Sequence, residues 1–169
     1  MAKKVYVPCK LFWAKLKPEN RDMGKNLPEG SDQRNKIEAE QGHYLVNCVI
    51  DHETKAQMIK DGIPNKGMQG QLFKEESDGT MFYKAKRPHF NPRMKNQDTD
   101  ETGIEMGPPK VVKEAEDGEL VLWDWETDGL IGNGTDAIVK FDVWDGKIIT
   151  LEAIKIINHV PYEATGEKF

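Results

Sequence analysis

Cysteine is scarce in this sequence, and its two cysteines stand far apart at Cys9 and Cys48. Neither lies in a Cys-x-x-Cys pair or at metal-ligand spacing from a histidine, which argues against a structural zinc site. We expect two reduced, buried thiols, as in a cytosolic protein. No apolar run is long enough to span a bilayer, and no apolar segment follows Met1, so neither a membrane helix nor secretion is expected.

Motifs of catalysis are also lacking. The sequence contains no His-Glu-x-x-His, no phosphate-binding P-loop and no Asp/Glu-x-Lys strand pattern, and its four histidines are scattered. We therefore expect a protein without catalytic activity, metal or cofactor. A metal-dependent nuclease that uses clustered carboxylates such as Asp98, Asp100 and Glu101 is kept as an alternative.

Positive charge is in the minority, with a formal net charge of −5, and this alone argues against a nucleic-acid-binding protein. The charges are segregated, however. Residues 1–17 hold five lysines and residues 84–95 hold five basic residues, with no acid in either segment. Residues 97–128 hold eleven acids against two lysines. A protein with such segregation can present a basic groove while it is acidic overall.

Strand patterns dominate what is present. Residues 138–144 and 147–160 are rich in β-branched and apolar residues, and the Asp145-Gly146 pair between them is typical of a two-residue hairpin turn. After the turn, Ile149, Leu151 and Ala153 alternate with polar residues, which predicts that these three share one face. The sequence therefore predicts an extended β-hairpin near its C-terminal end.

Further strands are predicted in four segments, each of which combines alternating or continuous apolar residues with flanking turn residues. They are residues 3–17, 43–51, 80–88 and 119–125. Two short helices are predicted between capping residues at 31–41 and 52–61. The fold class expected from these patterns is all-β with one or two short helices and long loops.

The third of these strands has the residues that a single nucleic-acid strand needs. Alternation places Phe82, Lys84 and Lys86 on one face and Tyr83 and Arg87 on the other. Unpaired bases stack on aromatic rings, and phosphates attract lysine and arginine. The alternative is an ordinary edge strand that positive charges keep soluble.

The first predicted strand mixes aromatic residues and lysines in a similar way. Phe12 and Trp13 lie between Lys10 and Lys15, which fits either base stacking or a half-buried strand with a solvated lysine face. Trp123 and Trp125 lie among acids, so burial is expected for at least one of them. The residues predicted to contact a nucleic acid are Lys10, Phe12, Trp13, Lys15, Phe82, Tyr83, Lys84, Lys86, Arg87, Phe90 and Arg93.

Two turns and the last residue resemble a known family. The turn Ile131-Gly132-Asn133-Gly134-Thr135, the Asp78-Gly79-Thr80 turn with its basic strand, and the terminal Phe169 resemble the single-stranded DNA-binding proteins of T7-like phages and related phage OB-fold proteins. The resemblance implies an OB-fold, a five-stranded Greek-key barrel, over residues 1–162 and a short flexible tail over residues 163–169. It also implies largely sequence-independent binding of single-stranded DNA in phage DNA replication and recombination, in the host cytoplasm.

Partners follow from the same resemblance. The family's acidic tail ends in an aromatic residue and recruits replication proteins, so Phe169 is expected to contact a polymerase or a helicase-primase. This tail is less acidic than the family's, because Glu163 and Glu167 stand against Lys168. The sequence leaves a monomer and a homodimer open. The main alternative function is an acidic all-β structural or adaptor protein of a phage, which would not require segregated basic and aromatic residues.

Overall fold

The computed structural model describes residues 2–67, 70–95, 102–146 and 148–162. Strands account for most of the regular structure, together with two short α-helices and a 3-10 turn at Pro18–Asn20. The helices are α1 (Asp32–Ala39) and α2 (His52–Lys60). The strands are β1 (Ala2–Lys15), β2 (His43–Ile50), β3 (Lys66–Gly67), β4 (Gly70–Gln71), β5 (Phe73–Glu75), β6 (Met81–Pro88), β7 (Phe90–Lys95), β8 (Thr102–Glu105), β9 (Lys110–Glu114), β10 (Leu120–Leu122), β11 (Thr135–Trp144) and β12 (Ile148–Asn158).

Five of the strands form a barrel. The main sheet has the order β10-β9-β12-β11-β1-β2-β6-β5, in which only the β9–β12 pair is parallel. β6 and β12 lie against each other and bring the two sides of the curled sheet together. The strands β1, β2, β6, β11 and β12 thus close in the connectivity of an OB-fold, and the fold class predicted from the sequence is confirmed.

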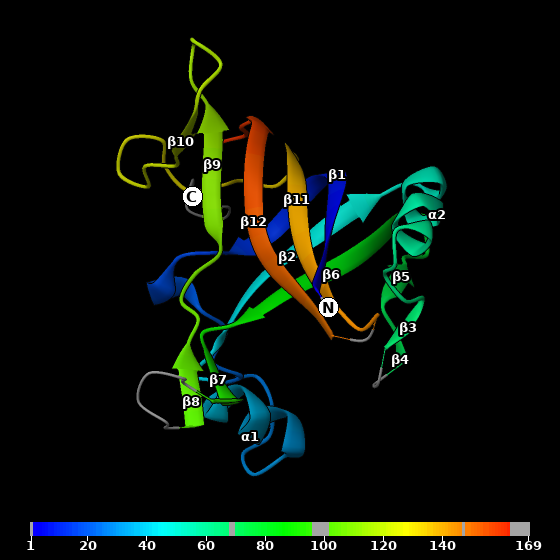
Figure 1. Cartoon of the computed structure of the whole chain (residues 1–169), viewed down its shortest axis with the longest axis vertical. Helices are drawn as coiled ribbons and strands as arrows, with labels where there is room; N and C mark the ends of the chain where they lie inside the picture. Colours follow the sequence, from blue (N-terminus) through cyan, green and yellow to red (C-terminus); the bar gives the residue numbers. More distant parts are fainter. Residues whose placement is uncertain (1, 68–69, 96–101, 147, 163–169) are drawn as a thin grey trace, which may run out of the picture.

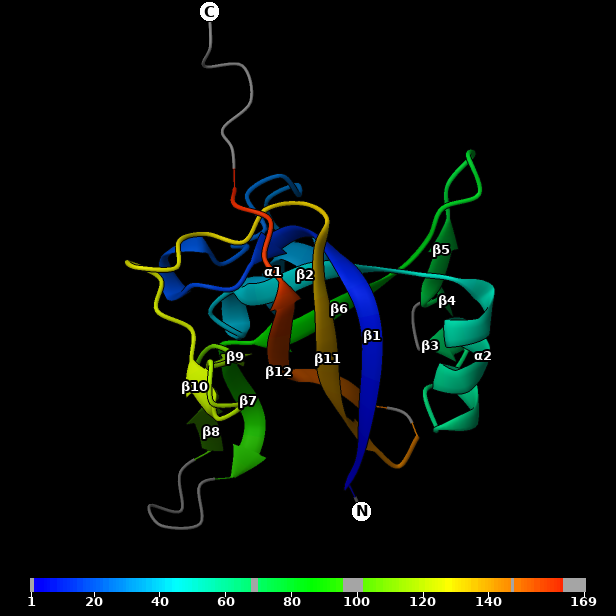
Figure 2. The same cartoon turned by 90° about the horizontal axis from the view of Figure 1, so that it is seen from above.

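The additional elements surround this barrel. α2 and the short strands β3–β5 lie on one side of it in both views, and β9 and β10 lie on the opposite side (Figures 1 and 2). β7 and β8 form a separate two-stranded sheet near α1. Both predicted helices are present, and their capping residues are Ser31, which accepts from the Arg34 N–H, and Asp51, which accepts from the Thr54 N–H.

The predicted hairpin is the pair β11–β12. Asp145 and Gly146 both have positive φ angles, 52° and 66°, as a two-residue turn of this kind requires. The predicted alternation in β12 is wrong beyond Leu151. A bulge shifts the register, because Phe141 pairs with Leu151 whereas Lys140 pairs with Ala153. The side chains that enter the core from β12 are therefore Leu151, Ile154 and Ile156.

Side chains from alternate positions of the strands fill the barrel, except where the bulge interrupts the alternation in β12. The members from the five barrel strands include Val5, Val7, Leu11, Val46, Cys48, Met81, Tyr83, Ala85, Val139, Phe141, Leu151 and Ile154. The positions between them point outward.

Candidate nucleic-acid interface

The outward side chains of β1, β2, β5 and β6 gather into one surface, which we call the basic face. Directly opposed residues in antiparallel strands point to the same side, so the register defines rows across the sheet. The rows are Lys10–Val49–Phe82–Lys74, Phe12–Asn47–Lys84 and Lys15–Leu45–Lys86. Neighbouring strands in a sheet lie about 4.8 Å apart, so the two phenylalanines lie among five lysines, and no member of the rows is acidic.

The lysines of this face are accessible. Lys15, Lys84 and Lys86 are exposed and form no ion pair with any residue in the described part of the chain, whereas Lys10 pairs with Asp136 at 2.9 Å. Phe12 and Phe82 are half-buried, so part of each side chain remains available to solvent. The basic face therefore combines cations without a carboxylate partner in that part of the chain and partly exposed aromatic rings.

The lysines also repel one another. The pKa of Lys86 is lowered, first by its partial burial and then by the positive charges of Lys84, Lys36 and Lys74, which outweigh the attraction of Asp22. Lys36 comes from α1, so the loop between β1 and β2 adds to the positive potential. A bound phosphate would relieve this repulsion, because an opposite charge nearby favours the protonated form of a lysine.

Trp13 follows Phe12 in β1, between the Phe12 row and the Lys15 row of the basic face. It occupies a bulge where the pairing of β1 with β2 shifts between Phe12 and Lys15. Its indole is 69% exposed, the largest value among the exposed large hydrophobic residues of the described chain. An exposed tryptophan offers a large flat ring on which an unpaired base can stack.

Tyr83 was predicted to contact a nucleic acid and does not lie on this surface. It is 3% exposed, its ring packs edge-on against Phe141 with centroids 5.4 Å apart, and Phe73 lies on another side at 5.2 Å. Burial raises the pKa of its hydroxyl well above the ordinary value. The prediction is corrected, since the strand alternation that exposes Phe82 turns Tyr83 into the core.

Arg87 is also committed to the protein's own structure. Its guanidinium donates to the carbonyl oxygens of Gly107 at 2.9 Å, Met106 at 2.9 Å and Leu151 at 3.2 Å. Burial lowers its pKa. These three bonds tie β6 to β12 and to the segment before β9, so Arg87 has a structural role here rather than the phosphate contact predicted for it.

Phe90 and Arg93 lie on β7, outside the rows of the basic face. The Phe90 ring lies over Gly103, where an added Cβ would come within 2.3 Å of the ring, so it packs within the β7–β8 hairpin. Arg93 is exposed but donates to the Glu40 carboxylate at 3.0 Å. Of the predicted residues, Lys10, Phe12, Lys15, Phe82, Lys84 and Lys86 share the basic face, and Trp13 lies in the bulge between its Phe12 and Lys15 rows.

A buried polar cluster joins β7 to the start of β2. The carboxylate of Glu40, which is 5% exposed, binds both His43 and Arg93. Beside it, the Tyr44 hydroxyl and His89 Nδ1 share a hydrogen bond of 2.7 Å, and His89 Nε2 lies 3.0 Å from Glu105. These contacts hold the β7–β8 hairpin on the barrel next to the basic face.

His43 makes the stability of this cluster depend on pH. Burial lowers its pKa more than the Glu40 carboxylate raises it, and Lys86 and Lys36 lower it further. In the unfolded chain His43 has its ordinary pKa of about 6.5 and therefore takes up a proton more readily than in the folded protein. The free energy of unfolding should therefore fall as the pH drops below this pKa. Urea unfolding at pH 7.5 and pH 5.5 measures this fall. The fall in unfolding free energy should be smaller in His43→Gln than in the parent protein. An equal fall in both proteins would show that His43 does not cause it.

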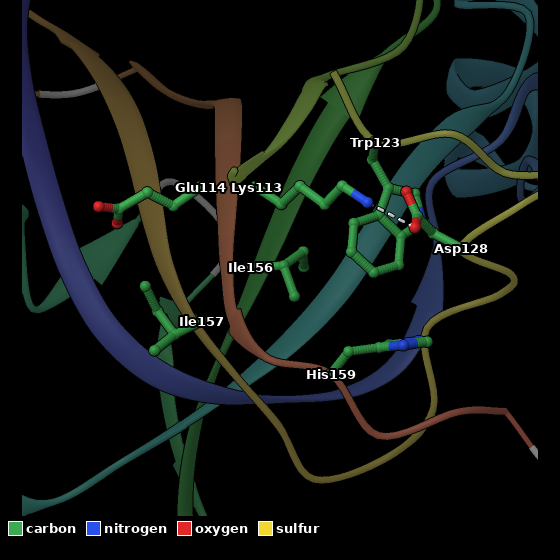
Figure 3. A pocket seen from close by; sticks show the side chains of 7 residues that line it. All are labelled: Lys113, Glu114, Trp123, Asp128, Ile156, Ile157 and His159. Carbon is green, nitrogen blue, oxygen red and sulfur yellow. Dashed lines mark hydrogen bonds and ion pairs between the residues drawn. The ribbon is translucent and has the colours of Figure 1, made fainter. Parts of the chain in front are cut away.

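A pocket of about 330 Å³ lies on the opposite side of the barrel, between β9, β12 and the segment after β10 (Figure 3). Lys113 crosses it to bind Asp128 at 2.6 Å, while Glu114 points away from this pair. Trp123 is 8% exposed, donates to the Gly129 carbonyl at 3.0 Å and packs edge-on against His159. The predicted burial of at least one tryptophan of this segment is confirmed, and the polar groups of the pocket largely satisfy one another.

Metal ligands do not gather in the part of the chain that the structure describes, where no three His, Cys, Asp or Glu side chains come together. Cys9 and Cys48 are free thiols, and the hydrogen bond with Cys9, together with burial, raises the pKa of Cys48. The described residues include no helix that is long and apolar enough to cross a membrane. Asp98, Asp100, Glu101 and the predicted tail with Phe169 lie outside the described residues.

The sequence did not point to several members of the basic face. Asn47 and Val49 belong to a strand that reads as apolar on both faces, and Lys74 lies in a loop-like segment. The register of the strands brings these residues to Phe82, Lys84 and Lys86, and a pattern within one strand does not contain that information. Lys36 lies on α1, outside the rows, but its positive charge lowers the pKa of Lys86.

No protein-family model and no curated protein matches the sequence. Solved structures do match. The crystal structure of gp2.5, a single-stranded DNA-binding protein encoded by bacteriophage T7, superposes with a TM-score of 0.58 at 15% identity, covering 99% of this chain and 97% of that one. The single-stranded DNA-binding protein from bacteriophage Enc34 in complex with single-stranded DNA gives 0.52 at 9% identity, over 95% and 89% of the two chains, and its C-terminal truncation gives 0.51 at 11% identity, over 95% and 87%. The resemblance to phage single-stranded DNA-binding proteins is confirmed for the fold, and the chain has the OB-like architecture of these proteins over nearly its whole length.

Proposed function

We propose that this protein binds single-stranded DNA through the basic face, without catalysis and with little sequence preference. The observation that carries the proposal is the set of rows in which Phe12 and Phe82 lie among five lysines, of which only Lys10 has a carboxylate partner, Asp136, in the described part of the chain. OB-folds bind oligonucleotides on the face of their second and third strands, which are β2 and β6 here. The similarity to structures of phage single-stranded DNA-binding proteins, one of them in complex with single-stranded DNA, also supports single-stranded DNA binding.

The chemistry divides between two kinds of side chain. The lysines attract the phosphates and release counterions from the strand, which provides affinity for any sequence. The exposed parts of Phe12, Phe82 and Trp13 stack on bases, and this is possible only where the bases are unpaired. Neither step breaks a covalent bond, so the face needs no metal or cofactor.

The biological setting proposed from the same similarity is phage DNA replication and recombination, in the cytoplasm of the host. There the protein would coat single strands as they are displaced. The tail that ends at Phe169 is proposed to contact replication proteins such as a polymerase or a helicase-primase. The protein would act as a monomer or a homodimer.

A titration tests the proposal directly. Fluorescently labelled oligo-dT and a duplex of equal length are titrated with the protein across a series of salt concentrations. We expect tighter binding of the single strand, quenching of tryptophan fluorescence, and a logarithm of the binding constant that falls linearly with the logarithm of salt concentration. Equal affinity for both DNAs, or no binding at low salt, would contradict the proposal.

A second candidate function has one observation in its favour. β10 is an edge strand whose residues Leu120, Val121 and Leu122 are all exposed, at 55%, 37% and 66%, and the flanking segments are acidic. Exposed apolar residues at a sheet edge are typical of protein–protein contacts. A protein that bound no DNA in the titration would be assigned to a structural or adaptor role through this edge.

A further inference from the structure

The most exposed tryptophan of the described chain is held in an unusual backbone conformation. Trp13 has a φ angle of 54°, in the left-handed region that bulky residues rarely adopt. The alternating pattern of β1 does not require a tryptophan at this position. Glycine is the residue that usually adopts a left-handed conformation in a bulge. A non-glycine residue persists in such a conformation only where its surroundings hold it, and such positions cluster at functional sites.

The turn formed by residues 131–135 supplies the surroundings. The side-chain oxygen of Asn133 accepts a hydrogen bond of 2.8 Å from the backbone N–H of Trp13. The N–H of Gly134 donates to the Leu11 carbonyl at 2.9 Å, on the other side of Phe12. Two bonds from one turn thus hold the backbone on either side of Phe12, at the start of the bulge that presents the indole.

The turn itself is fixed to the end of the barrel. The Thr135 hydroxyl donates to the Gly132 carbonyl at 2.9 Å and accepts from the Val160 N–H at 3.0 Å, and the Gly132 N–H donates to the Val160 carbonyl at 2.7 Å. A side chain at position 132 would lie 2.4 Å from the Pro161 carbonyl oxygen, so only glycine fits. Asn133 is therefore presented from a closely packed base rather than from a loose loop.

We infer that Asn133 is a positioning residue that holds Trp13 as a preformed stacking platform, and that this platform favours unpaired bases over duplex DNA. The inference rests on the proposed function and adds a determinant of specificity to it. The lysines of the basic face attract the phosphates of either DNA form. The indole gains a contact only from a base whose face is free, and the bases of a duplex already stack on one another. Fixing in advance the backbone that presents the indole also reduces the ordering that binding would otherwise require.

A double-mutant cycle with Trp13→Ala, Asn133→Ala and the double variant tests this inference. Affinities for labelled oligo-dT and for an equal-length duplex are measured at one salt concentration, after urea unfolding has shown that each variant is folded. Trp13→Ala should lose about 5-fold to 150-fold in single-strand affinity, since stacking on one aromatic residue contributes roughly 1–3 kcal/mol. Asn133→Ala should lose less than Trp13→Ala, the double variant should lose no more than Trp13→Ala alone, and duplex affinity should stay unchanged.

Asn133→Asp is the matched control, because it keeps the accepting oxygen. Measured at a salt concentration that screens its added charge, it should restore most of the single-strand affinity that Asn133→Ala loses. Additive losses in the cycle, or equal losses for single strand and duplex, would overturn the inference while leaving single-strand binding intact. A parent protein that binds no single strand would instead contradict the proposed function itself, and the two failures are distinct.

Discussion

Tyr83→Ala is expected to lose about 3–5 kcal/mol of unfolding free energy, as is typical when a buried aromatic residue is truncated to alanine. The ring of Tyr83 fills the space between Phe73 and Phe141 at the centre of the barrel, and it is 3% exposed. Its removal leaves a cavity that the surrounding strands fill only in part. The loss is measured by urea unfolding, from the shift of the midpoint at constant slope.

The neighbouring residue gives a matched comparison on the other face of the same strand. Phe82→Ala should lose less stability, because this ring is half-buried, yet it should weaken single-strand binding by about 1–3 kcal/mol. Tyr83→Phe should leave single-strand affinity unchanged, because the hydroxyl does not reach the basic face. A folded Tyr83→Phe variant with a tenfold loss of affinity would show that Tyr83 contacts DNA after all.

The pair Phe82 and Tyr83 also shows what can be read from the sequence. Alternation within one strand correctly separates the two faces of β6, and the Asp145-Gly146 turn correctly predicts the β11–β12 hairpin. Alternation does not say which face is the core when both contain an aromatic residue. That choice depends on the neighbouring strands, here on the contact between Tyr83 and Phe141.

Structural features that depend on partners far away in the sequence could not be predicted from local patterns. Judged by its positive charge alone, Arg87 could bind a phosphate as well as Lys86 could. Its structural role becomes visible only in its hydrogen bonds to the carbonyl groups of Met106, Gly107 and Leu151. The bulge in β12 arises from pairing with β11, so the apolar pattern of β12 alone misplaced its core residues. The left-handed conformation of Trp13 likewise depends on Asn133, which is 120 positions away in the chain.

Lys84→Ala combined with Lys86→Ala is expected to weaken the salt dependence of single-strand binding. For single strands, each phosphate contact contributes about 0.7 to the slope of the logarithm of affinity against the logarithm of salt concentration, so the double variant should flatten the slope by about 1.4. Both lysines are exposed and form no ion pair with a described residue, so their removal breaks no such pair. Stability should change little, since surface substitutions of this kind usually stay within about 0.5 kcal/mol.

Lys155→Ala is the control for the loss of positive charge alone. Lys155 lies on β12, outside the basic face, and binds Glu114 at 3.2 Å. If net charge governed binding, removing Lys155 would flatten the slope by half as much as the double variant. If the basic face governs it, Lys155→Ala should leave the slope unchanged, because a lysine outside the DNA path releases no counterion from the strand. An unchanged slope in the double variant would place the phosphate path elsewhere on the barrel. Equal flattening per lysine in all variants would mean that the charge of the whole protein, rather than contact with the basic face, holds the strand.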